Sequence, residues 1–277
     1  MNPRYQIIKP MLAVKFSPDH TLMPCYVQPK LNGIRALCNR KLRTFQTRRE
    51  EFWFDEMVAH FFAHLDAVGD KLPDVLDGEF YVHGWPLQRI AAAMTVVRER
   101  PIEDTLKVQY HVYDTVSNKQ FTSRYESLQA ETELIKVVPT EVVRSRIALQ
   151  ELHSKYIAAG YEGTMVRSGT APYLEGRTRA LQKIKKKLDY EVQVIGIIEG
   201  TGKFTGMVGA LVVEDPVKGV QFKVGSGSGF TDKSRKELWD NPPIGKWITI
   251  SSEAGLSDGG IPLQAQFELI IVRDYEG

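Results

Sequence analysis

KLNGIR, residues 30–35, places a lysine directly before an Asn-Gly pair, with the strand-like runs YVQPK and IRALCN on its two sides. Asn-Gly is a frequent two-residue connection between strands. Such a turn would hold Lys30 at a fixed point, while the following strand directs Arg35 toward the same place. An ordinary hairpin is the alternative interpretation of this stretch.

Three later segments set charged side chains beside glycines or inside strand-like runs. They are DGEF at 77–80, EGTMVR at 162–167 and LQKIK at 181–185. Carboxylates such as Glu79 and Glu162 can bind a ribose hydroxyl or a hard cation such as Mg²⁺. The alternative is that both are ordinary acidic residues in surface turns. Because side chains alternate along a strand, Lys183 and Lys185 lie on one face. The alternative is that they belong to a run of solvent-exposed lysines without a binding role.

Helical and strand-like patterns interleave around these segments without a repeat. Apolar residues recur at helical spacing after Asp55, a predicted N-cap, and further helices are predicted in PLQRIAAAM, TSRYESLQAETELI and ALQELHSKYIAAG. From Asp189 the chain changes to five strand-like runs with glycine-rich turns and one short helix near TDKSRKELW, which are the parts of an OB-fold. We predict an α+β domain of antiparallel sheets with helices at 1–188 and an all-β OB-fold domain at 189–277.

Composition narrows the class of protein. The hydrophobic share is 43%, the charged share 25% and the net charge +2, values typical of a globular chain. No apolar run approaches the roughly 20 residues that cross a bilayer, so we expect no membrane association and a cytoplasmic location. Cys25 and Cys38 are too few for a four-thiolate zinc site.

In their order along the chain, these segments resemble the signature of the covalent nucleotidyltransferases, the superfamily of ATP-dependent DNA ligases, RNA ligases and mRNA capping enzymes. The resemblance extends from Pro10 to the last strand. It implies that 1–188 is a nucleotidyltransferase, or adenylation, domain in which Lys30 takes AMP as a phosphoramidate. ATP is the implied cofactor together with Mg²⁺, for which Mn²⁺ can substitute. A lysine nucleophile must lose its proton, and we expect neighbouring cations and the metal to favour the free amine.

The resemblance also implies roles around the nucleotide. Arg35 would hold the ribose or the nick end, and Glu79 would serve the ribose and a metal ion. Glu162 would serve the metal. Lys183 and Lys185 would contact the α-phosphate.

Five further positions follow from the same resemblance. Tyr113 would stack on the adenine, with a strand aromatic in the core as the alternative. Gln28, two residues before the lysine and on the same strand face, would read the adenine amino edge. Arg48 would bind the 5′-phosphate of a nick, although Arg49 competes for that role. Arg273 would contact the pyrophosphate of ATP.

Two features bear on the substrate. The stretch EGTGKFTG at 199–206 lacks the GxxxxGK[ST] pattern of a phosphate loop and resembles the first hairpin of a ligase OB domain. GALVVED and FKVGSGSGFTD resemble segments of DNA ligases more than segments of capping enzymes.

Asn32 stands where the family has Asp, which puts in doubt any electrostatic help that this position gives to the lysine or the metal.

The sequence therefore predicts a monomeric ATP-dependent DNA ligase that seals nicks in duplex DNA through a lysyl-AMP and a DNA-adenylate, in DNA replication, repair or recombination. The two-domain arrangement resembles ligases of bacteriophages and other large DNA viruses, which would place it in a host cytoplasm, with a hinge near Leu188. The alternatives are an RNA ligase, an mRNA capping-type nucleotidyltransferase, or a non-catalytic nucleic-acid-binding relative.

Overall fold

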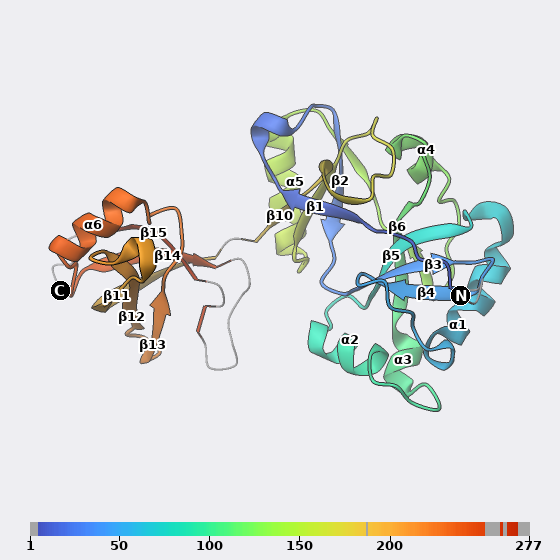
Figure 1. The fold of residues 1–277 in the computed structure, drawn as a ribbon. Helices are drawn as coiled ribbons and strands as arrows, with labels where there is room; N and C mark the ends of the chain where they lie inside the picture. The colour runs from blue at the N-terminus through green and yellow to red at the C-terminus, as the bar shows by residue number, and fades with distance from the viewer. Residues whose placement is uncertain (1–4, 187, 253–260, 263–264, 271–277) are drawn as a thin grey trace. The chain divides into compact units, whose positions relative to one another are not determined.

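The computed structural model describes all residues except 1–4, 187, 253–260, 263–264 and 271–277. The chain divides into two compact units, Met1–Lys185 and Lys186–Gly277 (Figure 1). The division lies close to the change of sequence pattern at Leu188. No helix in the described ranges is both long and apolar enough to cross a membrane.

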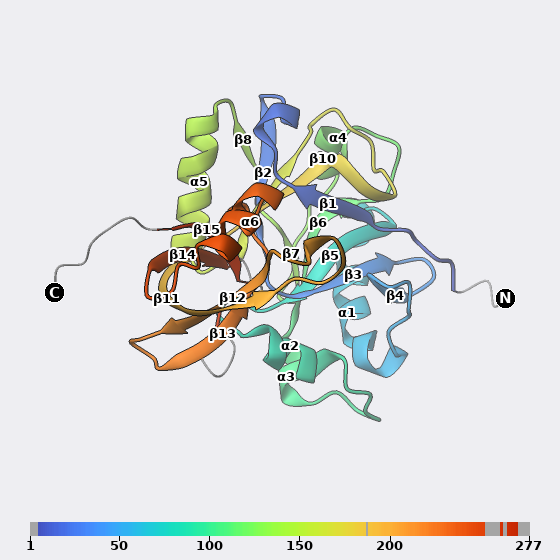
Figure 2. The same ribbon diagram turned by 60° about the vertical axis from the view of Figure 1, so that its left-hand side comes forward.

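Two five-stranded sheets form the first unit (Figures 1 and 2). The first has the order β1 (Met11–Lys15), β10 (Gly176–Lys185), β9 (Gly163–Arg167), β2 (Cys25–Lys30) and β8 (Glu141–Val143). The second has the order β4 (Thr44–Thr47), β3 (Ile34–Asn39), β5 (Val75–Tyr81), β6 (Gln109–Thr115) and β7 (Ile135–Val137). All pairs are antiparallel except β1 with β10 and β6 with β7.

The KLNGIR stretch carries the chain from one sheet to the other. β2 pairs with β8 and β9, whereas β3 pairs with β4 and β5, so the hairpin interpretation is wrong. Gly33 does not have the positive φ of a tight hairpin turn. A Cβ at this position would lie 2.3 Å from the carbonyl oxygen of Phe80. Glycine is therefore needed here because the crossing chain passes against β5.

Helices cover the outer faces of the two sheets (Figure 2). They are α1 (Asp55–Val68), α2 (Leu87–Met94), α3 (Glu103–Lys107), α4 (Phe121–Glu126) and α5 (Arg146–Ala158), with 3-10 turns η1 (Pro18–His20) and η2 (Gly69–Lys71). α1 buries the predicted apolar stripe, including Phe61 and Leu65, in the larger core. α5 packs Leu149 and Leu152 against the first sheet and is followed by Gly160 at φ +89°.

Three helix predictions need correction. Asp55 is the first helical residue rather than the N-cap, a position that Phe54 occupies without a side-chain hydrogen bond. The helix predicted over TSRYESLQAETELI is short, because the Ser127 hydroxyl bonds the carbonyl of Arg124 and the chain then turns toward η2. The short helix α3 was not predicted.

The second unit has the five strands and one helix predicted for it. The sheet order is β13 (Val220–Val224), β12 (Val208–Asp215), β11 (Leu188–Glu199), β14 (Trp247–Ser252) and β15 (Gln266–Ile270), with η3 (Gly202–Phe204) and α6 (Asp232–Asp240). Val192, Leu211 and Ile248 are among its fully buried core residues. A bridge between Ser226 and Gln266 connects the segment after β13 to β15, which closes the sheet into a barrel.

Candidate active site

One cavity of about 760 Å³ in the first unit is lined by nearly all the predicted site residues. They are Gln28, Lys30, Arg35, Arg48, Glu79, Tyr113, Glu162, Lys183 and Lys185. The remaining one, Arg273, lies outside the described residues. Side chains that are up to 157 positions apart in sequence, from Gln28 to Lys185, therefore share one enclosed space.

Strand register explains how three strands supply the floor of this cavity. Gly163 on β9 lies opposite Lys30 on β2 and Lys185 on β10. Met165, two residues on, lies opposite Gln28 and Lys183. Since side chains alternate along a strand, these residues form two successive rows on one sheet face, about 7 Å apart.

Glu162 joins two lysines at one end of the cavity. Its carboxylate forms an ion pair with Nζ of Lys30 and lies 3.3 Å from Nζ of Lys185. Its main-chain N–H also donates to the Lys30 carbonyl over 3.0 Å. The Lys30 amine is thus in contact with a carboxylate, and the effect of neighbouring cations and a metal on this amine stays a prediction. Glu162 must therefore exchange this contact, or take the proton, before the nitrogen can act as a nucleophile.

Lys183 lies in the second row among positive charges. Burial lowers its pKa, and the nearby charges of Lys185 and Lys30 act in the same direction. A group of cations held together in this way is favourable for an anionic ligand that neutralises them.

Glu79 is held where the crossing chain meets β5. Its Oε1 accepts a hydrogen bond from the Gly33 N–H at 2.7 Å. Burial raises its pKa to about 7, although the charge of Lys30 and the Gly33 hydrogen bond act against that rise. No cluster of three or more metal-ligating side chains is found among the described residues. Two carboxylates suffice for Mg²⁺, which takes its other ligands from water and phosphate, so Glu79 and Glu162 fit such an ion.

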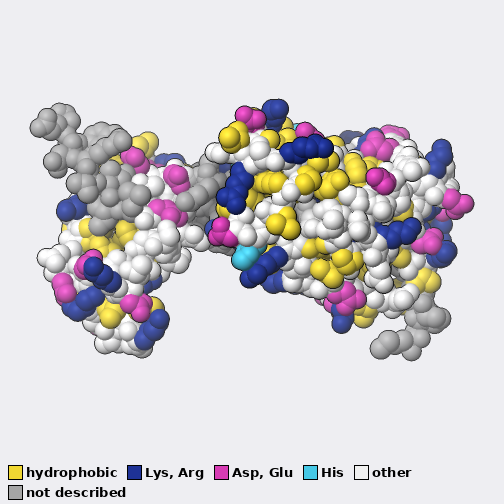
Figure 3. Space-filling model, turned by 90° about the horizontal axis from the view of Figure 1, so that it is seen from above, with side chains coloured by type: hydrophobic (Ala, Val, Ile, Leu, Met, Phe, Trp, Pro, Cys, Tyr) yellow, Lys and Arg dark blue, Asp and Glu magenta, His cyan; other side chains and the backbone are white. Residues whose placement is uncertain are grey.

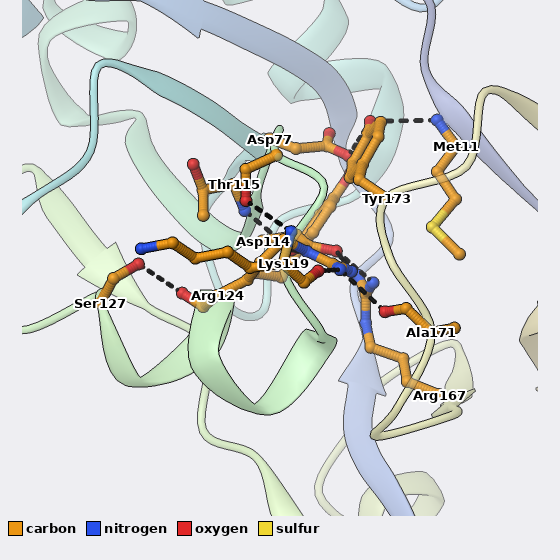
Figure 4. A network of polar contacts seen from close by, with 12 residues as sticks. Met11, Asp77, Asp114, Thr115, Lys119, Arg124, Ser127, Arg167, Ala171 and Tyr173 are labelled. Atoms are coloured by element: carbon orange, nitrogen blue, oxygen red, sulfur yellow. Dashed lines mark hydrogen bonds and ion pairs between the residues drawn. The ribbon is translucent and has the colours of Figure 1, made fainter.

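Arg35 is engaged by the protein itself. Its Nε and Nη2 bind the Asp77 carboxylate at 2.9 and 2.5 Å, and Nη1 donates to the Met11 carbonyl at 2.7 Å. The Tyr173 hydroxyl also donates to Asp77 at 2.7 Å, and these two residues are shown in Figure 4. Arg35 thus lines the cavity from a fixed position, and a contact with a ribose remains a prediction.

The amide of Gln28 is also used within the protein. Its Nε2 donates to the Tyr113 carbonyl at 3.1 Å and to the Thr140 hydroxyl at 2.8 Å, and its Oε1 accepts from Nε of Arg167 at 2.7 Å. Gln28 therefore ties β2 to β6 and β9. Its predicted contact with the adenine amino edge has no support from these bonds.

A buried charge network behind Gln28 was missed by sequence reasoning. Asp114 accepts hydrogen bonds from Arg124 and Arg167, and all three are at least 97% buried (Figure 4). The one local signal was Asp114 itself, the only acidic residue of β6. Its partners lie 10 and 53 positions away, so their contacts could not be read from spacing.

Tyr113 lies at the boundary between cavity and core. Tyr113 lines the cavity and also packs on the larger core. Its surroundings therefore fit in part the predicted stacking on a base and in part the alternative of a core aromatic. The guanidinium carbons of Arg35 and Arg167 lie 5.9 and 5.5 Å from the ring centroid.

Arg48 and Arg49 stand on a tight turn at the cavity. The Thr47 hydroxyl accepts from the N–H of Arg49 and of Glu51, and Glu50 has a φ of +67°. Both arginines are exposed and both line the cavity, so the geometry does not separate the two assignments for a 5′-phosphate.

Comparison with known sequences connects this geometry to a family. The profile described as ATP dependent DNA ligase domain matches residues 10–185, more than half of the chain, and includes every cavity residue named above. The chain belongs to the ATP-dependent DNA ligase family. A second profile, described as DNA ligase OB-like domain, matches residues 199–270. The predicted ligase family and the predicted fold class are therefore confirmed.

Relatives of this ligase chain are distant in sequence, and the matches span different shares of their lengths. The DNA ligase of Haemophilus influenzae is 26% identical over 245 residues, which span 86% of this chain and 83% of that protein. A DNA ligase of African swine fever virus is 26% identical over 269 residues, and this match spans 87% of this chain but 62% of the viral protein.

Solved DNA ligases share the fold. A Lig E DNA ligase structure matches with a TM-score of 0.69 and 28% identity, covering 96% of this chain and 100% of that one. A Chlorella virus DNA ligase-adenylate matches with a TM-score of 0.55 and 22% identity, covering 97% of this chain and 100% of that one, a likeness of fold alone.

Proposed function

We propose that this ligase seals nicks in duplex DNA through a covalent adenylate on Lys30. The observation that carries the proposal is the meeting of Lys30, Glu162, Lys183 and Lys185 in one cavity, which Tyr113 also lines. A chain of this family needs a single amine, cations for phosphate and an aromatic platform for a base, and one cavity provides all of them.

Three phosphoryl transfers make up the reaction. The Lys30 nitrogen attacks the α-phosphorus of ATP, a P–N bond forms and pyrophosphate leaves. The AMP then passes to the 5′-phosphate of the nick, and the 3′-hydroxyl displaces it to form the phosphodiester. Such transfers depend mainly on positioning and charge neutralisation, which Lys183 and Lys185 supply.

Glu162 has two roles in this scheme. Its carboxylate touches Nζ of Lys30 and is the group placed to accept the ammonium proton. It is also, with Glu79, one of the two side chains that would hold Mg²⁺ or Mn²⁺, which when bound adds positive charge beside the phosphates. Arg48 or Arg49 would bind the 5′-phosphate from the exposed turn.

The surface does not carry one large basic patch on the face seen in Figure 3, where Lys and Arg side chains are interspersed with Asp and Glu. Each phosphate that a Lys or Arg side chain contacts adds to the salt dependence, so we expect the affinity for duplex DNA to fall as the salt concentration rises. We propose that a monomer suffices, since one chain supplies Lys30, Glu162, Lys183 and Lys185 to the same cavity.

Intact mass after incubation with ATP and Mg²⁺ tests the proposal. Wild type should gain the mass of one AMP, and Lys30→Ala should gain none. Adenylated wild type should then seal a nick in duplex DNA in preference to a nick in duplex RNA. A wild-type protein that never acquires AMP under Mg²⁺ or Mn²⁺ would overturn the proposal, and sealing of RNA alone would reassign the substrate.

A further inference from the structure

The proposed reaction gives no role to Tyr161, the residue directly before Glu162, and its side chain does not line the cavity. Of the partly buried apolar side chains in the described ranges, Tyr161 alone packs against two cores. One is the larger core of the second sheet, and the other is the core between the first sheet and α5. The chain is therefore held from two sides immediately before the carboxylate that contacts Lys30.

The end of α5 fixes the main chain at Tyr161. Gly160, with a φ of +89°, donates its N–H to the Ile157 carbonyl over 3.1 Å. The N–H of Tyr161 donates to the Tyr156 carbonyl over 3.0 Å. These two bonds form a Schellman motif, in which the residues joined by the longer loop often also make an apolar contact. That contact is present, because the Tyr156 and Tyr161 ring centroids lie 5.9 Å apart.

The ring of Tyr161 also reaches the segment that follows β5. Its centroid lies 4.8 Å from that of His83, with the two ring planes at 52°. Nδ1 of His83 shares a hydrogen bond of 2.7 Å with the hydroxyl of Tyr81, the last residue of β5. Tyr81 lies two residues beyond Glu79 on that strand. The Tyr161 ring thus lies between the end of α5 and the end of the strand that carries Glu79.

Glu162 depends on this anchored neighbour for its position. It precedes β9, which begins at Gly163, so the strand ladder does not include it. Its side chain is 24% exposed. The Glu162 N–H donates to the Lys30 carbonyl over 3.0 Å, and its carboxylate forms the ion pair with Nζ of the same lysine. A displacement of the main chain at Tyr161 would therefore be transmitted to both contacts with Lys30.

We propose that Tyr161 is a positioning residue, whose ring, held between Tyr156 and His83, sets the Glu162 carboxylate against the Lys30 amine. The inference rests on the proposed function, in which Glu162 accepts the proton of that amine. Proton transfer requires the two groups within hydrogen-bond reach. A misplacement of about 1 Å can slow a reaction by about 100-fold. Loss of the ring should therefore slow adenylation without weakening the binding of ATP, because Tyr161 does not line the cavity.

Single-turnover self-adenylation tests this role. The rate of AMP attachment is measured by intact mass over a range of ATP concentrations at fixed Mg²⁺, for wild type, Tyr161→Leu, Tyr161→Phe and His83→Ala. Tyr161→Leu should lower the saturating rate by about 10- to 100-fold. Its half-saturating ATP concentration should change by less than about 3-fold. Tyr161→Phe keeps both ring contacts and should react like wild type.

The contact between Tyr161 and His83 is tested by combining their substitutions. His83 is exposed, so His83→Ala should fold, and it should lower the saturating rate by part of the amount that Tyr161→Leu does. In the Tyr161→Leu background, His83→Ala should add little, because the contact is already lost. Two losses that multiply fully in the double variant would overturn the inference.

Phe62→Leu is the matched control. Phe62 packs on the same larger core from α1, with the Phe45 ring centroid at 5.4 Å and the Arg43 guanidinium carbon at 4.6 Å, and it does not line the cavity. Its replacement also removes two contacts of an aromatic ring. It should lower the melting temperature and leave the saturating rate near that of wild type. A loss of rate equal to that of Tyr161→Leu would overturn the inference.

Amide hydrogen exchange gives a readout that needs no catalysis. In Tyr161→Leu, the N–H of Glu162 should exchange about 10-fold faster or more than in wild type, and in Phe62→Leu it should exchange as in wild type. Unchanged exchange, or an unchanged saturating rate, in Tyr161→Leu would overturn the inference. A wild-type protein that forms no adduct would overturn the proposed function, and the exchange comparison would then still decide whether Tyr161 holds Glu162 in place.

Discussion

Replacing Glu79 by Gln should stabilise the first unit at alkaline pH and leave its stability at acidic pH nearly unchanged. Burial raises the pKa of Glu79 to about 7, against a model-compound value of 4.5. A carboxyl group with a raised pKa in the folded state makes its full contribution to stability at a pH below its unfolded pKa. This contribution is lost as the pH rises through the folded pKa, because the charged form is disfavoured in the folded protein. The stability of wild type should therefore fall, because of Glu79, between about pH 4.5 and pH 7. A neutral amide keeps the acceptor for the Gly33 N–H without the buried charge.

The difference between the two pKa values sets an upper limit of about 3 kcal/mol on the gain above pH 7. Partial exposure of Glu79 to the cavity reduces this figure. For a unit of this size each kcal/mol raises the melting temperature by about 2–4 °C. Thermal unfolding of wild type and Glu79→Gln at about pH 5 and pH 8.5 measures the effect.

Glu51→Gln provides the control, since Glu51 is an exposed acid at the same cavity. Its two melting temperatures should differ from those of wild type by the same small amount at both pH values. A gain for Glu79→Gln that is equal at acidic and alkaline pH, or larger at acidic pH, would refute the reasoning. The same variant should lose self-adenylation, since the carboxylate is a predicted ribose and metal contact.

Other substitutions have similarly direct outcomes. Gly33→Ala should lower the stability of the first unit by about 2 kcal/mol or more in denaturant unfolding, because its Cβ would overlap a backbone oxygen; an unchanged midpoint would contradict this. His60→Phe should stabilise by about 1–2 kcal/mol, because both ring nitrogens are buried without a partner among the described residues. Burial lowers the His60 pKa to about 4, so wild type loses stability as pH falls from about 6.5 toward 4, and the advantage of the variant should be larger at pH 5 than at pH 8. Arg40→Met should cost about 2–3 kcal/mol, because Nη2 bonds the Leu65 and Gly69 carbonyls at the end of α1, and circular dichroism melting would show it. Glu162→Gln should slow self-adenylation at saturating ATP by about 10²-fold or more in a mass time course, and a rate like wild type would exclude Glu162 as the proton acceptor.

The sequence was sufficient to place residues on a common face wherever one strand carried them. Lys183 and Lys185 follow from alternation, and Gln28 lies on the face of Lys30 for the same reason. The OB-fold strands were visible because short apolar runs alternate with glycine-rich turns. These features are local, and local patterns are what a sequence displays.

Pairing between distant segments was not visible. Nothing local in KLNGIR shows that β2 and β3 belong to different sheets, because the same Asn-Gly pair also suits a hairpin. The Glu162 contact with Lys30 depends on register between β2 and β9, so it could not be read from either segment alone. Short strands such as β7 and β8 carry too few residues for a periodic signal.

The crossing between β2 and β3 ties the position of Lys30 to the alignment of the two sheets. Lys30 is the last residue of β2 and Ile34 is the first residue of β3, so only three residues connect the two sheets at this point. Gly33 lies against β5 and leaves this short tether little slack. A movement of one sheet relative to the other would therefore also move the backbone of Lys30.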